Sequence, residues 1–156
     1  MKTHKYRSHL TWTGQKGTGT TDYRSYDRSY EISIDGKPIF KGSADLSFRG
    51  DPAFHNPEEL LLMALSSCHM LWYLHLCADA GVVVVDYQDK AQGTMIEESD
   101  GSGRFSEVTL RPEVVISESD GEELALKLHK KAGRMCFIAN SCNFPVRHSP
   151  VVVKAN

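Results

Sequence analysis

The sequence of 156 residues predicts an α+β fold made of a single domain, residues 1–156. One observation is a long apolar segment in the middle of the chain, with a helix start signal at Asn56 and a stop signal at Gly81. The other is the set of alternating, strand-like segments on both sides of it, which lack the regular strand–helix alternation of a parallel α/β protein. The expected order of elements is β-β-β-α-β-β-α-β.

The sequence contains clear signals for the start and the end of the central helix. Asn56 is a favourable N-cap, Pro57 suits the first helical position, and the acidic Glu58 complements the positive end of the helix dipole. Residues 60–78 carry no acidic or basic charge and are apolar on nearly every face. A helix of this kind in a soluble protein is expected to be covered by protein on all sides.

Three strands are expected before the central helix, because apolar and polar residues alternate there. They are residues 6–13 as a half-buried strand, 23–34, and the short segment 38–41. The glycine-rich residues 14–22 form a loop between the first two, and Asp35–Gly36 forms a hairpin turn. Residues 43–55 are an irregular connection to the helix.

A long hairpin and a second helix are expected after Gly81. The hairpin runs through residues 82–97 and returns through 105–117 after the turn at 100–103, with Pro112 marking an irregularity or an edge. The second helix is capped by Ser119–Asp120, continues to about Met135, and is amphipathic through Leu124, Leu126, Leu128 and Ala132. A last strand covers residues 151–153.

Composition and charge exclude several classes of protein. A net charge of −2 gives no electrostatic reason to bind nucleic acid or an anionic membrane. The polar N-terminus has no signal-peptide core, and the acidic cap of the central helix argues against a membrane span of similar length. Four cysteines without paired C-x-x-C spacing favour neither a disulfide scaffold nor a zinc site. We expect a cytoplasmic protein without a metal or other cofactor.

Cys68, in the middle of the central helix, has two interpretations. It is either a small core residue or a protected reactive thiol, and a mid-helix position denies it the help of a helix N-terminus. A reactive thiolate would need a cation such as Arg24, Arg28 or Arg49. Arg24 and Arg28 share one face of the expected second strand with Tyr26 and Tyr30, which could equally be a solvated sheet face.

Glu58 could orient such an arginine. It precedes Cys68 by ten residues, which corresponds to about 15 Å along a helix. The two side chains therefore share a site only through a long bridging arginine or across a subunit interface, which favours a dimer.

Cys136, after the second helix, is a possible partner for Cys68 in forming a disulfide, although sequence alone does not show whether the sulfurs meet. Cys77 is about 13 Å from Cys68 on the same helix and is expected in the core. Cys142 is expected to be structural.

A metal cluster of His69, His75 and His129 is disfavoured, because His69 and His75 are six residues apart on different helix faces. A hydrolase using Cys136 and His129 is disfavoured by their separation along the helix.

Two separated motifs resemble the OsmC/Ohr family of thiol peroxidases. The first is Asn56-Pro-Glu-Glu-Leu60 followed by Ala64-Leu-Ser-Ser-Cys68-His, and the second is Leu128-His129 followed by Cys136-Phe-Ile-Ala-Asn140-Ser. The resemblance covers essentially the whole chain. It departs from the organic-hydroperoxide branch at Cys136-Phe-Ile-Ala, where that branch has Cys-Pro-Tyr-Ser, and this indicates a less characterised OsmC-like subgroup.

The resemblance implies an intertwined homodimer with sites at the subunit interface and a thiol-dependent peroxidase acting in the oxidative stress response. Cys68 would be the peroxidatic cysteine and Cys136 the resolving cysteine, with Arg28 and Glu58 activating the thiolate and Arg24 and Arg49 as reserve arginines. The substrate would be an organic hydroperoxide, which the apolar Met70, Leu71, Trp72 and Phe137 would suit, and the reductant a dithiol such as a lipoylated protein. The alternative is a non-catalytic protein of the same fold that binds a small apolar ligand at the dimer interface.

Overall fold

The computed structural model describes residues 1–117 and 121–155, and they form the α+β mixture of helices and strands that the sequence predicts. The chain divides into two compact units, Met1–Leu61 and the residues from Leu62 onward. The long helix α1 (Pro57–Ala80) begins in the first unit and continues through the second. That residues 1–156 form a single domain stays a prediction.

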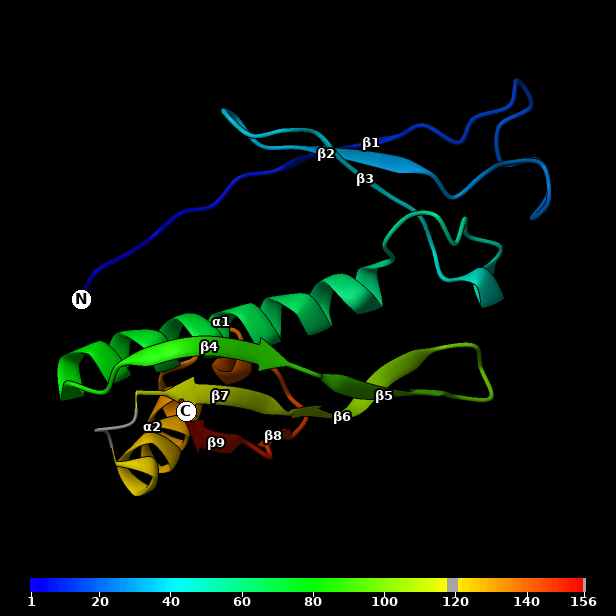
Figure 1. Ribbon diagram of the computed structural model, residues 1–156. Coiled ribbons are helices and arrows are strands. Elements are labelled where there is room, and N and C mark those ends of the chain that lie inside the picture. The colour runs from blue at the N-terminus through cyan, green and yellow to red at the C-terminus, as the bar shows by residue number, and fades with distance from the viewer. Residues whose placement is uncertain (118–120, 156) are drawn as a thin grey trace. The chain divides into compact units, whose positions relative to one another are not determined.

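The first unit contains a small antiparallel sheet with the strand order β1-β2-β3 (Figure 1). Its strands are β1 (His9–Trp12), β2 (Tyr30–Ser33) and β3 (Phe40–Gly42), and a short 3-10 helix, η1 (Leu46–Phe48), follows. All four residues of β1 are exposed, so the expectation of a half-buried first strand is wrong for this chain by itself.

The expected second strand is much shorter than predicted. Residues 23–26 form turns and bends and residues 27–29 precede the strand, so Arg24, Tyr26 and Arg28 do not share a strand face with Tyr30. The reason is local turn chemistry, because the Asp22 carboxylate accepts a hydrogen bond from the Arg24 N–H at 2.7 Å. An Asx turn of this type diverts the backbone from an extended conformation that the residue pattern alone would favour.

Helix α1 has the ends that the sequence predicts. The Glu59 N–H donates to Asn56 Oδ1 at 2.8 Å, and the Asn56 N–H donates to Glu59 Oε2 at 3.3 Å. This reciprocal pair is a capping box, which satisfies backbone N–H groups that a helix start leaves without partners. At the other end, Gly81 has a φ of 73°, a left-handed conformation that glycine adopts at little cost.

The second unit contains two three-stranded sheets, with the strand orders β4-β7-β9 and β5-β6-β8. Their strands are β4 (Val84–Asp89), β5 (Gln92–Glu97), β6 (Gly103–Leu110), β7 (Pro112–Ile116), β8 (Val146–His148) and β9 (Val151–Lys154). In Figure 1, β4 leads into β5 and β6 leads into β7, so the two sheets continue the expected long hairpin. The break falls at Arg111, just before Pro112.

The last part of the chain returns to both sheets. The expected final strand is confirmed as β9, which pairs in parallel with β7. β8 is an additional strand that the sequence did not predict, and it pairs in parallel with β6. It is three residues long and directly follows Pro145, so it has almost no alternating pattern to detect.

Helix α2 (Glu122–Met135) and part of α1 enclose the core of the second unit together with β7. The expected cap, Ser119–Asp120, lies outside the described residues. Of the four apolar residues expected to form its buried face, Leu128 and Ala132 are buried, whereas Leu124 and Leu126 are exposed. Ala125 and His129 complete the buried face instead.

The expectation that α1 is covered on all sides is wrong for the single chain. Its fully buried residues are Leu65, His69, Tyr73, Leu76 and Cys77. Leu71 is 62 % exposed and Met63 is 42 % exposed. By length and composition α1 could cross a membrane, a property that it shares with the core helices of many globular proteins.

Three histidines gather in the interior of the second unit. His69 Nε2 lies 3.0 Å from His129 Nδ1, and the two rings are nearly parallel with centroids 5.3 Å apart. The ring of Tyr73 stacks on His129 with a centroid distance of 3.7 Å, and His148 packs against His69 at 4.3 Å. His69, His129 and Tyr73 are each at most 1 % exposed, so this stack joins α1, α2 and β8 inside the protein.

The histidines of this stack are held in the neutral form. Burial lowers the pKa of His69 to about 3, with His148 and His129 as further causes. Burial likewise lowers the pKa of His129 to about 3, with a smaller contribution from His148. Neutral imidazoles suit the His69–His129 hydrogen bond, because one ring nitrogen must donate and the other must accept.

Gly133 of α2 packs closely against His148 of β8. A Cβ at this position would lie 2.8 Å from Cε1 of His148, whose ring is confined by His69. We therefore expect Gly133→Ala to lower the free energy of unfolding by about 1–3 kcal/mol through overpacking. Helix propensity alone would give a gain of about 1 kcal/mol. Urea denaturation measures the difference, and His148→Ala should remove the penalty. A stabilising Gly133→Ala substitution in the wild-type background would contradict the overpacking.

The buried histidines should make the free energy of unfolding depend on pH. Between about pH 6.5 and about pH 3 the unfolded chain binds protons on His69 and His129 that the folded chain does not, so the free energy of unfolding falls as the pH falls. Well below pH 6.5 each histidine contributes a limiting slope of about 1.4 kcal/mol per pH unit. Urea denaturation at several pH values should give a smaller slope for His69→Leu/His129→Leu. An unchanged slope would show that these two histidines do not cause it.

Candidate functional site

The second unit brings Cys68 and Cys136 together. Cys68 is half-buried on α1, and Cys136 is 1 % exposed at the C-terminal cap of α2. The Cys136 thiol hydrogen-bonds with Cys68. Cys68 and Cys136, the candidate pair expected from the sequence, are therefore in contact, and both are free thiols.

The environment of Cys136 is set by the end of α2 and the turn that follows. The Cys136 N–H donates to Ala132 O, so the residue still belongs to the last helical turn. The short helix η2 (Ala139–Ser141) folds back, and the Ala139 N–H donates to Cys136 Sγ at 3.5 Å. Burial, followed by the hydrogen bond to Cys68, raises the pKa of Cys136 to about 11. Cys136 is therefore a protonated donor toward Cys68.

Two aromatic side chains close in sequence to the cysteines contact each other. Trp72 lies one turn after Cys68 on α1, and Phe137 directly follows Cys136. Their rings meet edge to face with centroids 5.4 Å apart. Phe137 remains 65 % exposed, so this pair presents an apolar surface. Such a surface suits a substrate with an apolar body.

The other two cysteines have structural surroundings. Cys77 is 1 % exposed and belongs to the hydrophobic core, as the sequence predicts. Cys142 is half-buried, and its thiol donates to Ile138 O at 3.3 Å. Ile138 O and Ala139 N belong to the same peptide group, so the Cys136 and Cys142 sulfurs are bound at its two opposite ends.

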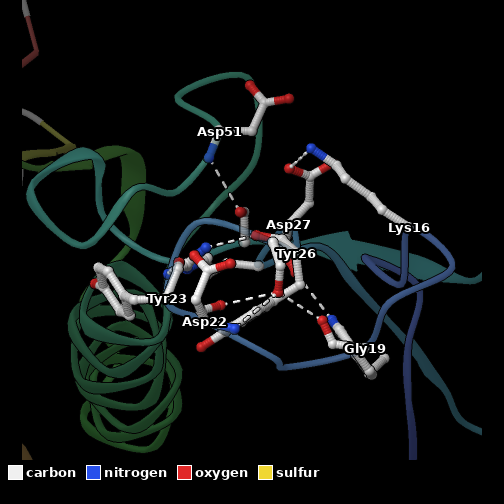
Figure 2. Close-up of polar contacts among 11 residues, drawn as sticks. Lys16, Gly19, Asp22, Tyr23, Tyr26, Asp27 and Asp51 are labelled. Carbon is white, nitrogen blue, oxygen red and sulfur yellow. Dashed lines mark hydrogen bonds and ion pairs between the residues drawn. The ribbon is translucent and has the colours of Figure 1, made fainter.

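The first unit holds the other predicted site residues. The Arg28 guanidinium lies 4.2 Å from the ring centroids of Tyr23 and Tyr26, and it donates to the carbonyl oxygens of the same two residues at 2.6 and 2.5 Å. Figure 2 shows Tyr23 and Tyr26 in this loop, with the ion pair between Lys16 and Asp27 beside them. Arg28 and Arg49 border one hollow of about 330 Å³ in this unit.

Glu58 lies in the first turn of α1 and acts electrostatically on Tyr30. Burial, and then the charge of Glu58, raise the pKa of the Tyr30 phenol. Within the residues that the structure describes, the ion pairs include none between Glu58 and Arg24, Arg28 or Arg49. The activating roles of Arg28 and Glu58 stay predictions.

The histidines do not form a metal site in the described part of the chain. No group of three or more histidine, cysteine, aspartate or glutamate side chains there has the arrangement to hold a metal ion. His69 and His129 meet, but His75 lies elsewhere on α1 and pairs with Asp79 at 3.5 Å. Nothing in the sequence predicts that His148 lies beside His69 and His129, because these histidines are distant in sequence and only the fold joins them.

A second hollow, of about 430 Å³, lies beside α1 in the second unit. Its lining is Leu62, Met63, Ser66, Ser67, Met70, Tyr87, Asp89, Lys90 and Ala91. Ser66 Oγ donates to Asp89 Oδ2 at 2.5 Å within it. Cys68 is not part of this lining, so the hollow is separate from the thiol pair.

Comparison with known proteins agrees with this fold. The chain has 31 % sequence identity and a TM-score of 0.84 with the OsmC-like protein of unknown function VCA0330 from Vibrio cholerae, covering 96 % of this chain and 100 % of that one. The organic hydroperoxide resistance protein OhrB of Bacillus subtilis has a TM-score of 0.63 at 19 % identity, covering 94 % of this chain and 98 % of that one, a likeness of fold alone.

A curated relative and a family model extend the comparison. The uncharacterized protein YmaD of Bacillus subtilis is 29 % identical over 89 residues, and the match covers 55 % of this chain and 59 % of that protein. Thus the chain matches less than two thirds of that relative's length. Residues 50–150 match the model of the OsmC-like proteins, and this range includes both cysteine motifs. With its OsmC-like fold, the chain belongs to the OsmC-like family.

Proposed function

We propose that this protein is a thiol-dependent peroxidase that reduces organic hydroperoxides to alcohols. The observation that carries the proposal is the hydrogen-bonded contact between the free thiols of Cys68 and Cys136. Two thiols that already touch can form a disulfide with little movement, provided that their Cβ atoms reach the strict disulfide geometry. The family of the chain includes proteins named for organic hydroperoxide resistance, which supports the same reaction.

The reaction has two steps at the protein. The Cys68 thiolate attacks the terminal peroxide oxygen, the O–O bond breaks, and the alkoxide takes a proton and leaves as alcohol, with Cys68 oxidised to a sulfenic acid. The Cys136 sulfur then attacks the Cys68 sulfur. Its thiol proton and the sulfenic hydroxyl leave together as water, and a Cys68–Cys136 disulfide remains. A dithiol, such as that of a lipoylated protein, reduces the disulfide by exchange.

The difference in exposure between the thiols supports this order. Cys68 is half-buried whereas Cys136 is buried and protonated, so peroxide reaches Cys68 more easily. The apolar surface of Trp72 and Phe137 favours a peroxide with an apolar body over hydrogen peroxide. We assign the thiol activation to Arg28, oriented by Glu58, as the family resemblance implies.

The proposal includes a cytoplasmic homodimer. Exposed apolar residues on β1 and α1, such as Leu10 at 59 % and Leu71 at 62 %, support a partner surface. The reduced thiols of Cys68 and Cys136 suit a reducing compartment. The alternative function, binding of a small apolar ligand, is favoured by the partly apolar hollow beside Met63 and Met70.

The cysteines provide the central test. Cys68→Ser should abolish turnover of an organic hydroperoxide such as cumene hydroperoxide, because no sulfenic acid can form. Cys136→Ser should complete one turnover and stop with Cys68 as sulfenic acid. Stopped-flow kinetics measure the rates, and intact mass should show the loss of two hydrogens in the wild type, restored by dithiol.

Cys142→Ser is the matched control and should turn over normally. Full turnover by Cys68→Ser would refute the peroxidase, and an inert wild type carrying a co-purified ligand would favour the binding protein.

The arginines can be separated by their effect on the first step. Arg28→Gln should slow formation of the Cys68 sulfenic acid by about 100-fold, because a positioned cation that stabilises charge in a reaction has effects of that order. Arg24→Gln and Arg49→Gln are the controls and should leave the rate near that of the wild type. Single-turnover trapping of the sulfenic acid with dimedone measures each rate. A large loss in Arg49→Gln with none in Arg28→Gln would move the role to Arg49.

A further inference from the structure

We infer that His69 and His129 are positioning residues for the two thiols, since their buried hydrogen bond holds α1 and α2 where Cys68 and Cys136 can join. The inference rests on the proposed function, whose disulfide-forming step it explains. Neither histidine is assigned contact with the substrate or the reacting sulfurs. They act through the two helices that carry the cysteines.

The connection between the two pairs follows from the helices themselves. Cys68 and His69 are consecutive residues of α1. His129 precedes Cys136 by seven residues, which is two turns of α2, so both lie on the same side of that helix. Two polar contacts therefore link α1 and α2, the His69–His129 hydrogen bond of 3.0 Å and the Cys68–Cys136 contact.

The histidine contact is the stronger of the two. A thiol is a weak hydrogen-bond donor, so the cysteine contact by itself does little to fix the helices. The histidine pair is buried, and Tyr73 stacks on His129 at 3.7 Å. His148 of β8 packs against His69 from another element. These contacts restrict rotation of both rings, so the hydrogen bond sets the spacing between α1 and α2.

Burying His69 and His129 carries a free-energy cost that apolar core residues would not have. His69 Nδ1 and His129 Nε2 are buried without a hydrogen-bond partner among the described residues. Whichever ring donates in the shared hydrogen bond, one donor and one acceptor remain unmatched. Apolar side chains of similar size would fill the same space without this cost. A buried polar contact that fixes one arrangement of two helices gives specificity in return.

The step that this positioning serves is closure of the disulfide. The Cys136 sulfur bonds to the Cys68 sulfur, the bond from Cys68 to the sulfenic hydroxyl breaks, and that hydroxyl leaves with the Cys136 thiol proton as water. Disulfide geometry tolerates little displacement of the Cβ atoms. A small change in the spacing of α1 and α2 therefore acts on closure, whereas attack of peroxide on Cys68 needs only one of the helices.

The test measures closure without peroxide. Wild type and variants, each with Cys77→Ala and Cys142→Ser, are equilibrated with reduced and oxidised glutathione, and the fraction of Cys68–Cys136 disulfide gives the effective concentration of the thiols. His69→Leu/His129→Leu removes the hydrogen bond and leaves no unmatched partner. We expect it to lower the effective concentration by about 10- to 100-fold, where each tenfold is about 30 mV in potential.

Conservative variants provide the rescue. The amide of glutamine can stand near the position of His69 Nε2, and that of asparagine near His129 Nδ1, so His69→Gln and His129→Asn should each keep the effective concentration close to the wild-type value. Val114→Ala, a core substitution on β7 rather than on α1 or α2, controls for lost stability and should leave the effective concentration unchanged. If the double leucine variant does not fold, His69→Phe replaces it, since it keeps an aromatic ring and removes the nitrogen.

The outcomes decide between the two claims. An unchanged effective concentration in the leucine variant, failed rescue by His69→Gln and His129→Asn, or an equal loss in Val114→Ala would overturn the positioning role. The rate of sulfenic acid formation with cumene hydroperoxide, measured in the same variants, should be unchanged. If the wild type does not react with peroxide while the glutathione equilibrium still depends on the histidines, the peroxidase proposal fails and the positioning role stands.

Discussion

The packing of α1 against α2 and β7 is the constraint on which the rest of the second unit depends. Tyr73, Leu76 and Cys77 of α1 are buried in the same cluster as Ala125 and Ala132 of α2. Since α1 carries Cys68 and Cys136 caps α2, the packing that forms the core also brings the two thiols into the same part of this unit. The fold and the candidate chemistry are therefore not separable in this unit.

Burial divides the proposed work between the two cysteines. Loss of solvent and the hydrogen bond to Cys68 keep Cys136 protonated, which makes it a poor first nucleophile toward peroxide. The same protonated thiol is well placed to donate to Cys68 before oxidation and to supply the proton that leaves with water afterwards.

The sequence predicted those features that are local. The N-cap at Asn56 and the stop at Gly81 bound α1 correctly, because capping depends on a few adjacent residues. The prediction failed over residues 23–29, where one Asx turn at Asp22 outweighs an alternating pattern. Exposure of Leu71 was also missed, because apolarity shows what could be buried and not what covers it. The meeting of Cys68 and Cys136 was expected only through the family resemblance, and the packing of His148 against His69 depends on a parallel strand too short to leave a pattern.

The close approach of Gly133 to His148 has a consequence for the history of the family. Since a Cβ at position 133 would come within 2.8 Å of the imidazole, the two positions share one small volume. A larger residue at the helix position requires a smaller one on the strand, and enlarging the helix position first passes through an overpacked intermediate. Related sequences should therefore show correlated substitution at these two positions, with glycine retained wherever the histidine is present.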